Sequence, residues 1–317
     1  MKEKNEDGKM TNLGKTSASR ENALTYHYAD YKTILSPKNG MNVYRGCTHN
    51  CIYCDSRSVC YQMKHDFEDI EVKRNAVRIL ESQLLRKRKR AIISTGAMCD
   101  PYTHLEEELQ ITRQCLELIE KYGFGLAIQT KSNLILRDLD LLLEIHKNYK
   151  CVVQMTLTTF DEDLCHIIEP DVSTTSERFS VLETMRDVGI PTVVWLSPTL
   201  PFITDTEENL SGLLDYCVGA KVRGIINFGF GTTMREGSRE YFYKKLDEHF
   251  PGVKEKYIKT FGNQYVCDSP NASRLWEIYR AVCRQNDILH RTGDVFADMH
   301  RFEQEARQMT LELTVDT

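Results

Sequence analysis

Residues 45–57 have the sequence RGCTHNCIYCDSR, in which Cys47, Cys51 and Cys54 follow the spacing C-x3-C-x2-C. No fourth cysteine follows at ligand spacing. Three thiolates can hold three irons of a [4Fe–4S] cluster, which leaves the fourth iron without a protein ligand. A cluster held by four cysteines usually carries electrons, whereas an iron with an open position can bind a reacting molecule. The stretch therefore predicts a catalytic iron–sulfur site.

Zinc is the main alternative metal for this stretch. Cys47, His49, Cys51 and Cys54 could form a site of three cysteines and one histidine. However, Cys47 and His49 are only two residues apart, and zinc sites usually carry two separated pairs of ligands. A third interpretation is that the cysteines hold no metal, and their clustering argues against it. The spacing favours iron–sulfur and leaves zinc open.

The composition is that of an ordinary globular protein, since 41% of the 317 residues are hydrophobic and 27% are charged. The net charge of −5 gives no overall basic field that would attract nucleic acid. The eleven cysteines are too sparse and irregular for a disulfide scaffold. The chain has no apolar run of transmembrane length, and its polar N-terminus does not resemble a signal peptide. We therefore expect a cytoplasmic protein without membrane association.

The chain is expected to have three regions. Residues 1–20 are polar and predict a disordered N-terminal arm. Residues 21–250 alternate between apolar and amphipathic segments and predict one core domain. Residues 251–317 predict a mostly helical C-terminal extension that packs on the core, with one clear helix at 272–285.

Short apolar runs rich in Val and Ile recur along the core, which is typical of parallel strands covered on both faces. We expect strands at residues 41–44, 91–94, 125–129, 151–157, 192–196 and 224–228. Helices are expected near residues 72–87, 106–122, 138–147, 174–188, 207–219 and 239–248. This alternation predicts an α/β fold with a parallel sheet, a partial TIM barrel of (β/α)6 type. The cysteine stretch follows the first strand, at the edge where such barrels carry their active sites.

Several segments resemble one group of proteins. The segments MNVYRGCTHNCIYCDSR, STGAMCDPYTHLEEELQITR, IQTKSNLILRDLDLL, MTLTTFDEDLCHIIEPDVSTTSERF and GIPTVVWLSPTLPFITDT are similar to the spore photoproduct lyase-related, DNA repair photolyase-like group of the radical S-adenosylmethionine (SAM) superfamily. The resemblance covers roughly residues 40–235. It implies a partial (β/α)6 barrel, a [4Fe–4S] cluster and SAM, whose amine and carboxylate chelate the open iron. It also implies an external electron donor of flavodoxin or ferredoxin type.

The resemblance also assigns residues to the cofactors. The three cysteines take the role of cluster ligands, and Tyr53 occupies the position of an aromatic side chain beside the adenine. Gly96 ends the second strand, where the methionyl amine binds, although the acidic GGE form of this segment is absent. Lys131 could pair with the methionyl carboxylate, and Thr156 matches a ribose or carboxylate contact. A core tyrosine, a solvated lysine and a core threonine are the ordinary alternatives.

Cys99 is a candidate catalytic residue by the same resemblance, because a cysteine near the second strand returns a hydrogen atom to the product radical in spore photoproduct lyase. Its ordinary alternative is a buried structural cysteine. The basic run at residues 86–90 could touch phosphates, but cations also suit a helix end. Nucleic acid is therefore possible as a partner but not favoured.

Together these features predict a radical SAM enzyme. One electron from the cluster would cleave SAM to a 5′-deoxyadenosyl radical that acts on an unidentified substrate. The alternatives are a DNA photoproduct lyase-like repair enzyme and a non-enzymatic iron–sulfur or zinc protein.

Overall fold

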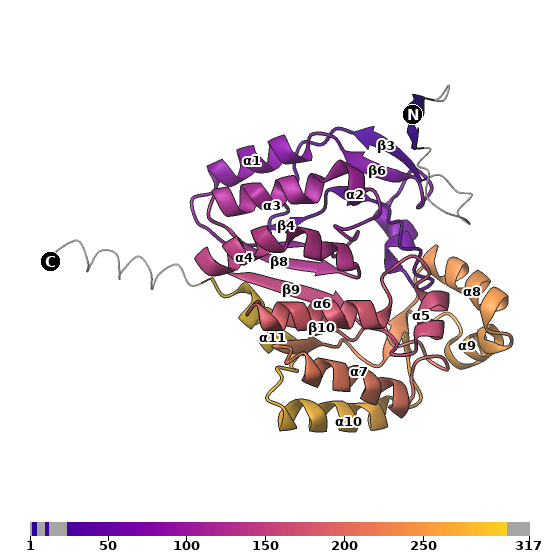
Figure 1. The fold of residues 1–317 in the computed structure, drawn as a ribbon. Helices are drawn as coiled ribbons and strands as arrows, with labels where there is room; N and C mark the ends of the chain where they lie inside the picture. The colour runs from indigo at the N-terminus through magenta and orange to yellow at the C-terminus, as the bar shows by residue number, and fades with distance from the viewer. Residues whose placement is uncertain (1, 5–9, 13–23, 303–317) are drawn as a thin grey trace.

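A six-stranded parallel sheet organises the chain, in the order β11-β10-β9-β8-β7-β4 (Figure 1). The computed structural model describes residues 2–4, 10–12 and 24–302. The strands are β4 (Gly40–Met41), β7 (Ile92–Thr95), β8 (Gly125–Thr130), β9 (Cys151–Thr156), β10 (Thr192–Trp195) and β11 (Gly224–Ile226). Strand β4 comes first in the chain, and each later strand of this sheet lies beside the one before it. Successive right-handed crossovers produce this order. The predicted α/β class and partial TIM barrel are confirmed.

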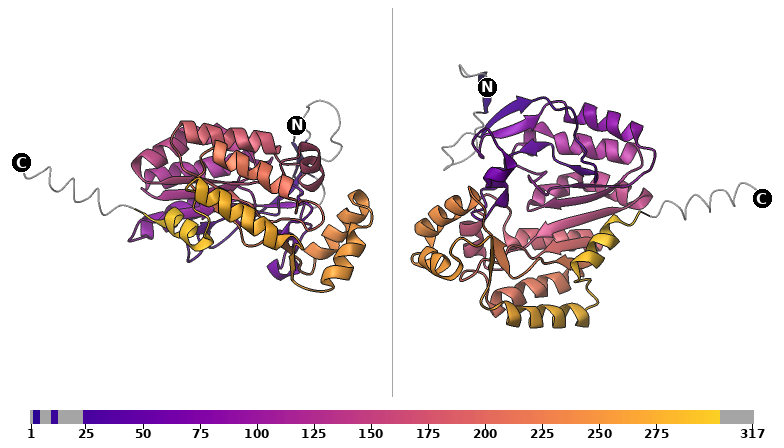
Figure 2. Two further views of the ribbon diagram at one scale, coloured as in Figure 1. Left: turned by 90° about the horizontal axis from the view of Figure 1, so that it is seen from below. Right: turned by 180° about the vertical axis from the view of Figure 1, so that it is seen from behind.

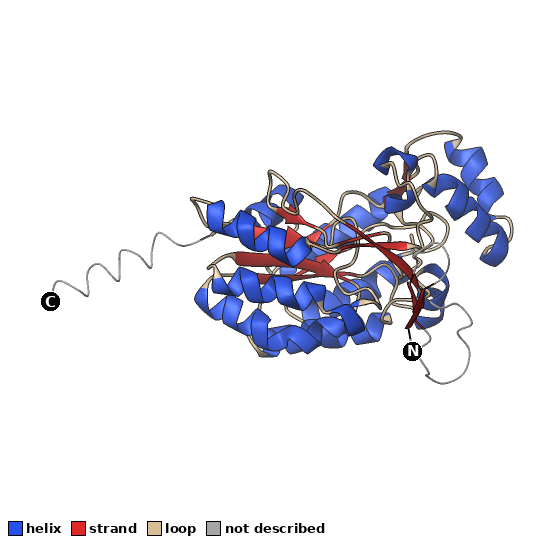
Figure 3. Ribbon diagram, turned by 90° about the horizontal axis from the view of Figure 1, so that it is seen from above, coloured by secondary structure: helices blue, strands red, loops and turns tan. Residues whose placement is uncertain are grey.

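Helices connect these strands and cover the outer face of the sheet. They are α1 (Ala76–Arg86), α2 (Glu106–Leu109), α3 (Ile111–Lys121), α4 (Leu139–Asn148), α5 (Glu162–Ile168), α6 (Thr175–Asp187) and α7 (Glu207–Gly219). Helix α3 buries Leu116 and Ile119 in the same apolar cluster as Val153 and Met155 of β9. Thr174 and Glu177 form a capping box that starts α6. In Figure 3 the strands run through the middle of the molecule, with a layer of helices along one side.

The opposite, inner face of the sheet is partly filled by the C-terminal part of the chain. Helix α11 (Thr292–His300) packs Val295 and Met299 against Val152, Val193 and Ile226. Because side chains alternate along a strand, Val152 faces α11 while its neighbour Val153 faces the outer helices. The view from behind in Figure 2 shows α11 against the strands.

The part of the chain after β11 contains more structure than its sequence predicted. Helices α8 (Ser238–His249) and α9 (Val253–Phe261) form a separate apolar cluster beside the cysteine stretch. Strand β12 (Gly231–Thr233) pairs with β13 (Val266–Asp268), and α10 (Ala272–Gln285) packs on α7. The prediction of one clear helix after residue 251 was therefore too sparse. No helix in the described parts of the chain has the length and apolar character that crossing a membrane requires.

A second sheet lies beside the cysteine stretch and was not predicted. It has the order β1-β2-β3-β6-β5, with strands β1 (Lys2–Lys4), β2 (Met10–Asn12), β3 (Thr25–Ala29), β6 (Ile70–Lys73) and β5 (Tyr44–Arg45). Two predictions were wrong here. The expected strand at 41–44 is divided between β4 and β5, and the expected helix at 72–87 begins only at Ala76. Residues 70 and 72 are buried while 71 and 73 are less so, which is the period of a strand.

The predicted N-terminal arm falls mostly outside the described residues. Its described parts, Lys2–Lys4 and Met10–Asn12, form the paired strands β1 and β2. The last part of the C-terminal extension, residues 303–317, also lies outside the described residues. The division into arm, core and extension therefore stays a prediction.

Candidate active site

A cavity of about 90 Å³ lies where the carboxyl ends of β7, β8 and β9 meet the cysteine stretch. The structure brings every predicted site residue to its wall: Cys47, Cys51, Tyr53, Cys54, Gly96, Cys99, Lys131 and Thr156. The zinc alternative also included His49, which lines the same wall. The strand ends position these groups as expected for a parallel α/β barrel.

The cysteine stretch is fixed to the rest of the fold by backbone contacts. Gly46 has a φ of +88°, and a Cβ at this position would lie 2.5 Å from the carbonyl oxygen of Phe67. Only glycine fits such a turn without strain. The amide of Ile52 donates to the carbonyl of Ile168 over 3.0 Å, and the Ile52 side chain is buried against the α8–α9 cluster. The thiols on either side of Ile52 are thereby held at the cavity wall.

The three thiols of the cysteine stretch can be compared with the ligands of a single metal ion. Cys47, Cys51 and Cys54 are free thiols. A zinc ion binds sulfur at about 2.3 Å, so two sulfurs on one zinc lie at most about 4.6 Å apart. Within the described residues, these three sulfurs do not form a group in which all members lie within 4.8 Å of one another. Among the described residues, the three sulfurs are thus not grouped as closely as three ligands of one zinc ion would be.

The thiols of the site have unequal acidity. A hydrogen bond with Cys99 holds the pKa of Cys47 well below its usual value, against the opposing effect of burial. Burial raises the pKa of Cys51 and of Cys54. Metal ligation needs the thiolate form, so loading this site must release protons from the two less acidic thiols.

Asp100 joins the loop after β7 to the end of β8. Its carboxylate accepts from the Thr130 hydroxyl and the Lys131 amide, both at 2.7 Å, and from the Tyr102 amide at 2.9 Å. The ring of His49 lies 3.4 Å from the same carboxylate. Sequence reasoning missed this residue, because a single Asp before Pro101 gives no signal of long-range contacts. Asp100 sets the position of the backbone from which Lys131 extends.

A buried ion pair connects the cysteine stretch to the end of β9. Glu169 and Arg178 lie 2.6 Å apart, and both side chains are fully buried. The Tyr53 hydroxyl donates to Glu169, and Arg178 donates to the carbonyl of Thr156 over 2.8 Å. Sequence reasoning missed this pair too. One signal was available in α6, where Arg178 lies on the same buried face as residues 181, 182 and 185. An arginine on such an apolar face indicates a buried charge that needs a partner.

Lys131 keeps its positive charge in this environment. Burial alone would lower the pKa of its ammonium, but the charges of Cys51 and Glu169 raise the pKa above its usual value. Its Nζ lies 5.9 Å from the centre of the Tyr53 ring. A partly buried, persistent cation beside an aromatic ring can hold a carboxylate of a bound molecule.

The backbone at Gly96 permits the strand ends to approach closely. Gly96 has a φ of +101°, and a Cβ there would lie 2.0 Å from the carbonyl oxygen of Gln129 on β8. We expect Gly96→Ala to destabilise the protein by about 2–5 kcal/mol, from positive φ and overpacking together. The matched control is Gly189→Ala, which has a φ of +82° but no atom within 4 Å of its Cβ. Urea unfolding measures both, and equal effects in the two variants would contradict the expectation.

A second, larger cavity of about 340 Å³ adjoins the first. The two share Tyr53, Cys54, Ser56, Ala97, Met98 and Lys131. The larger cavity adds aromatic walls from Trp195 and Phe228 and a carboxylate from Asp268. Phe228 is 66% exposed, so one wall of this cavity reaches the surface. The volume suits a small molecule or one part of a larger one.

Cys99 lies beside the cysteine stretch, at the wall of the smaller cavity. Its side chain is buried, and its thiol contacts Cys47 and the carbonyl of Asp100. It lines the smaller cavity, whereas its neighbour Met98 lines both. Cys99 therefore reaches the smaller cavity but does not line the larger one.

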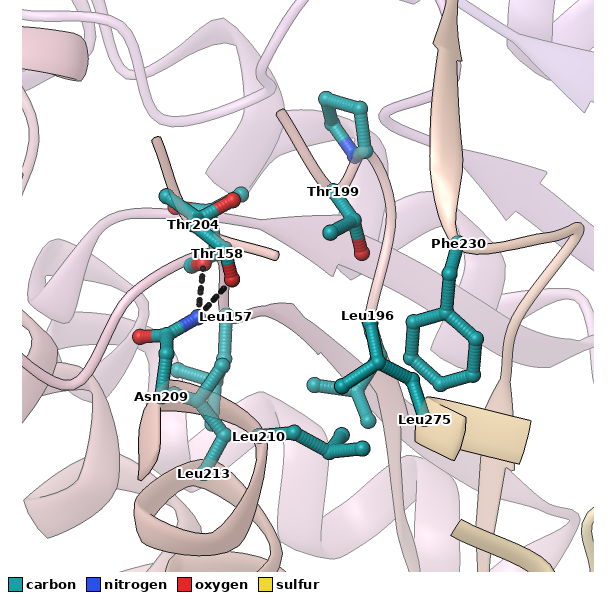
Figure 4. A pocket seen from close by; sticks show the side chains of 11 residues that line it. Leu157, Thr158, Leu196, Thr199, Thr204, Asn209, Leu210, Leu213, Phe230 and Leu275 are labelled. Atoms are coloured by element: carbon teal, nitrogen blue, oxygen red, sulfur yellow. Dashed lines mark hydrogen bonds between the residues drawn. The ribbon is translucent and has the colours of Figure 1, made fainter. Parts of the chain in front are cut away.

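A third cavity, between β9, β10 and helices α7 and α10, is part of the core (Figure 4). Its volume is about 10 Å³, which leaves room for no more than one water. The amide of Asn209 donates to the carbonyls of Thr158 and Thr204, at 3.2 and 2.9 Å, and closes one side. This cavity is a packing gap rather than a binding site.

Comparison with known proteins finds uncharacterized relatives. One protein of Mycobacterium tuberculosis is 29% identical over 259 residues, which cover 77% of this chain and 76% of that protein. One of Methanocaldococcus jannaschii is 27% identical over 255 residues, which cover 79% of this chain and 92% of that protein. Their descriptions state no activity.

Solved structures show which fold the chain resembles, and a family description shows its superfamily. A spore photoproduct lyase with bound AdoMet and dinucleoside spore photoproduct has a TM-score of 0.56 and 16% identity, covering 77% of this chain and 72% of that one. Another spore photoproduct lyase, a mutant, has a TM-score of 0.57 and 14% identity, covering 82% and 79%. These likenesses concern the fold. The sequence pattern of the radical SAM superfamily matches residues 41–214, more than half of the chain, so this protein belongs to the radical SAM superfamily.

Proposed function

We propose that this protein is an enzyme that reductively cleaves SAM and acts on a substrate bound in the larger cavity. The observation that carries the proposal is the meeting of three thiols, Gly96 and Lys131 at one cavity wall, with the larger cavity directly beside it. Membership of the superfamily supports the same chemistry. The substrate is unidentified.

Each site residue takes one role in this proposal. Cys47, Cys51 and Cys54 would hold a [4Fe–4S] cluster through three irons. When bound, the cluster and SAM supply one-electron cleavage of SAM to a 5′-deoxyadenosyl radical that can take hydrogen from a substrate. An electron donor of flavodoxin or ferredoxin type would reduce the site.

The remaining residues bind and orient. Lys131 would pair with the SAM carboxylate, and Gly96 would let the backbone of the β7 end approach the methionyl amine. Tyr53 would contact the adenine, with its hydroxyl held by Glu169. Thr156 would contact the ribose or carboxylate from the inner face of β9, where the Gln129 side chain donates to its hydroxyl over 3.4 Å.

The closest alternative is a photoproduct lyase acting on DNA. It is favoured by the fold of the spore photoproduct lyases and by the flat walls of Trp195 and Phe228, on which a base could stack. Two observations weigh against it. Cys99 contacts Cys47 instead of lining the larger cavity. The basic run at 86–90 ends α1 and precedes β7, so it lies at the amino ends of the strands, opposite the cavities.

Reduction of the reconstituted protein with dithionite in the presence of SAM is expected to yield 5′-deoxyadenosine. Lys131→Ala is expected to weaken SAM binding by about ten- to a hundredfold, the loss of one charge-assisted contact. Equilibrium binding of SAM and chromatography of the nucleoside measure the two effects. The control is Lys121→Ala, an exposed lysine at the end of α3.

The outcomes separate the candidate functions. A protein that binds the cluster yet forms no 5′-deoxyadenosine would be an electron carrier, and the proposal would be wrong. Reversal of a thymine photoproduct in DNA, lost in Cys99→Ala, would replace the unidentified substrate by DNA. Unchanged SAM affinity in Lys131→Ala would remove Lys131 from the cofactor site.

A further inference from the structure

A group of two histidines and one glutamate lies at the second sheet and the loop before β6, on residues distinct from those of the cysteine cavity. His27 of β3 and Glu71 of β6 are direct neighbours in the parallel register. His65 comes from the loop that precedes β6. The Nε2 atoms of His27 and His65 lie 3.8 and 4.0 Å from the same oxygen, Oε2 of Glu71. The three ligand atoms all lie within 4.8 Å of one another.

The other nitrogen of each ring is already engaged. Nδ1 of His27 lies 3.1 Å from the carboxylate of Asp69, and Nδ1 of His65 lies 3.0 Å from the carbonyl of Asp66. An ionised carboxylate and a carbonyl can only accept, so both Nδ1 atoms carry the proton. In a neutral ring the Nε2 atom then holds a lone pair. Histidines that bind metals show this same arrangement, in which an outer acceptor fixes the tautomer.

With both rings in the neutral form, three lone pairs face one another at this point. The distances from the two Nε2 atoms to Oε2 are longer than hydrogen bonds. Nε2 of His65 is buried and has no hydrogen-bond partner. A buried polar atom without a partner is costly, and donor atoms that converge without protons between them repel. A cation at their centre would remove both penalties.

We propose that His27, His65 and Glu71 bind one divalent transition-metal ion, with zinc as the best candidate. Imidazole nitrogen and carboxylate oxygen bind zinc at about 2.0–2.2 Å, which puts ligands of a tetrahedral site about 3.3–3.6 Å apart. The observed separations require these side chains to move inward by about half an ångström. Asp69 and Glu71 supply two negative charges, which balance the charge of the ion. Water would occupy the fourth position, since the three side chains are 14–27% exposed.

The ion would join three segments that surround the cysteine stretch. It would tie β3 and β6 to the loop at 62–69, whose Phe67 carbonyl contacts the turn at Gly46. On the other side of β6, Arg45 donates to the carbonyls of Tyr61 and Gln62, at 2.6 and 3.0 Å. The site is thus a structural clamp beside the active site, and it does not depend on the function proposed above.

Zinc binding to the anaerobic, cluster-loaded protein tests this site, because the three thiols of the cysteine stretch are then occupied by iron. We expect one zinc per chain after gel filtration, measured by mass spectrometry together with iron. His65→Ala is expected to lose this zinc while it keeps the full iron content. His249→Ala, an exposed histidine on α8, is the control and should keep both metals. Equal zinc in the wild type and His65→Ala would overturn the proposal.

A milder variant covers the case in which His65→Ala does not fold. Asp69→Ala leaves the three ligands intact and removes the outer acceptor of His27. Its zinc affinity is expected to fall about ten- to a hundredfold. Cobalt(II) gives an independent readout, since a tetrahedral site held by nitrogen and oxygen has visible absorption without a thiolate charge-transfer band. Such a thiolate band, or unchanged affinity in Asp69→Ala, would place the metal elsewhere and refute the assignment.

Discussion

Replacing Cys54 by alanine is expected to abolish a stable [4Fe–4S] cluster and, with it, the formation of 5′-deoxyadenosine. Removing a group that only orients a metal ligand already costs about ten- to a hundredfold in affinity, and a lost ligand costs more. After anaerobic reconstitution and gel filtration, iron and labile sulfide per chain should therefore fall more than about tenfold relative to the wild type. Both are measured colorimetrically on the same sample.

Cys60→Ala is the matched control for this experiment. Cys60 lies a few residues after Cys54 and is an exposed free thiol that does not line either active-site cavity. Iron and sulfide contents should stay at the wild-type level in this variant. A Cys54→Ala protein that retained a full four-iron content would show that the three-cysteine assignment is wrong.

The second large effect is expected from Arg178→Met, which leaves Glu169 buried without its partner. Removing one member of a buried ion pair typically costs about 3–5 kcal/mol, because the remaining charge has lost its compensation. Urea unfolding at neutral pH measures the loss. Arg186→Met serves as the control, since Arg186 lies on the same helix but pairs with exposed Asp187. The control should leave the stability nearly unchanged.

The pH dependence of this loss gives a further check. Burial opposes ionisation of Glu169, but the charges of Arg178 and Lys131 hold its pKa below the usual range. The stability from this group is therefore present above the unfolded-state pKa of about 4.3 and is lost as pH falls through the folded-state pKa. In Arg178→Met burial raises the pKa of Glu169, so its carboxyl is protonated sooner on acidification. The stability difference between wild type and variant should shrink from about pH 8 to about pH 5, and a constant difference would argue against an uncompensated carboxylate.

The sheet could be predicted from sequence because its strands are buried on both faces. The strand Cys151–Thr156 is buried along its whole length, with Gln154 as its one polar residue before Thr156 at the active-site edge. Gly96 and Lys131 follow such strand ends, and the cysteine stretch comes a few residues after β4, beyond the short strand β5, so all three reach the same edge of the sheet. The predicted site residues line one cavity, and their assignment as a site stays a prediction.

The parts that sequence did not reveal depend on distant contacts. Strands β3 and β6 are short, and polar residues flank them in the sequence. Their pairing joins residues far apart along the chain, such as Tyr26 and Ile70. Asp100 and Arg178 gain their importance from partners far along the chain, which no local pattern encodes. Helix α11 has an ordinary amphipathic sequence, and its position on the inner face of the sheet is set by Val295 and Met299.

The aromatic wall of the larger cavity gives the protein an internal optical probe. The chain has two tryptophans. The Trp195 indole donates to Gln154 over 2.9 Å and packs between the rings of Phe228 and Phe296, whereas Trp276 lies on α10 near Phe230. Since the emission of an indole depends on the polarity around it, a Trp276→Phe protein would report occupancy of the cavity through Trp195 alone. Candidate substrates can thus be ranked by fluorescence titration before any turnover is observed.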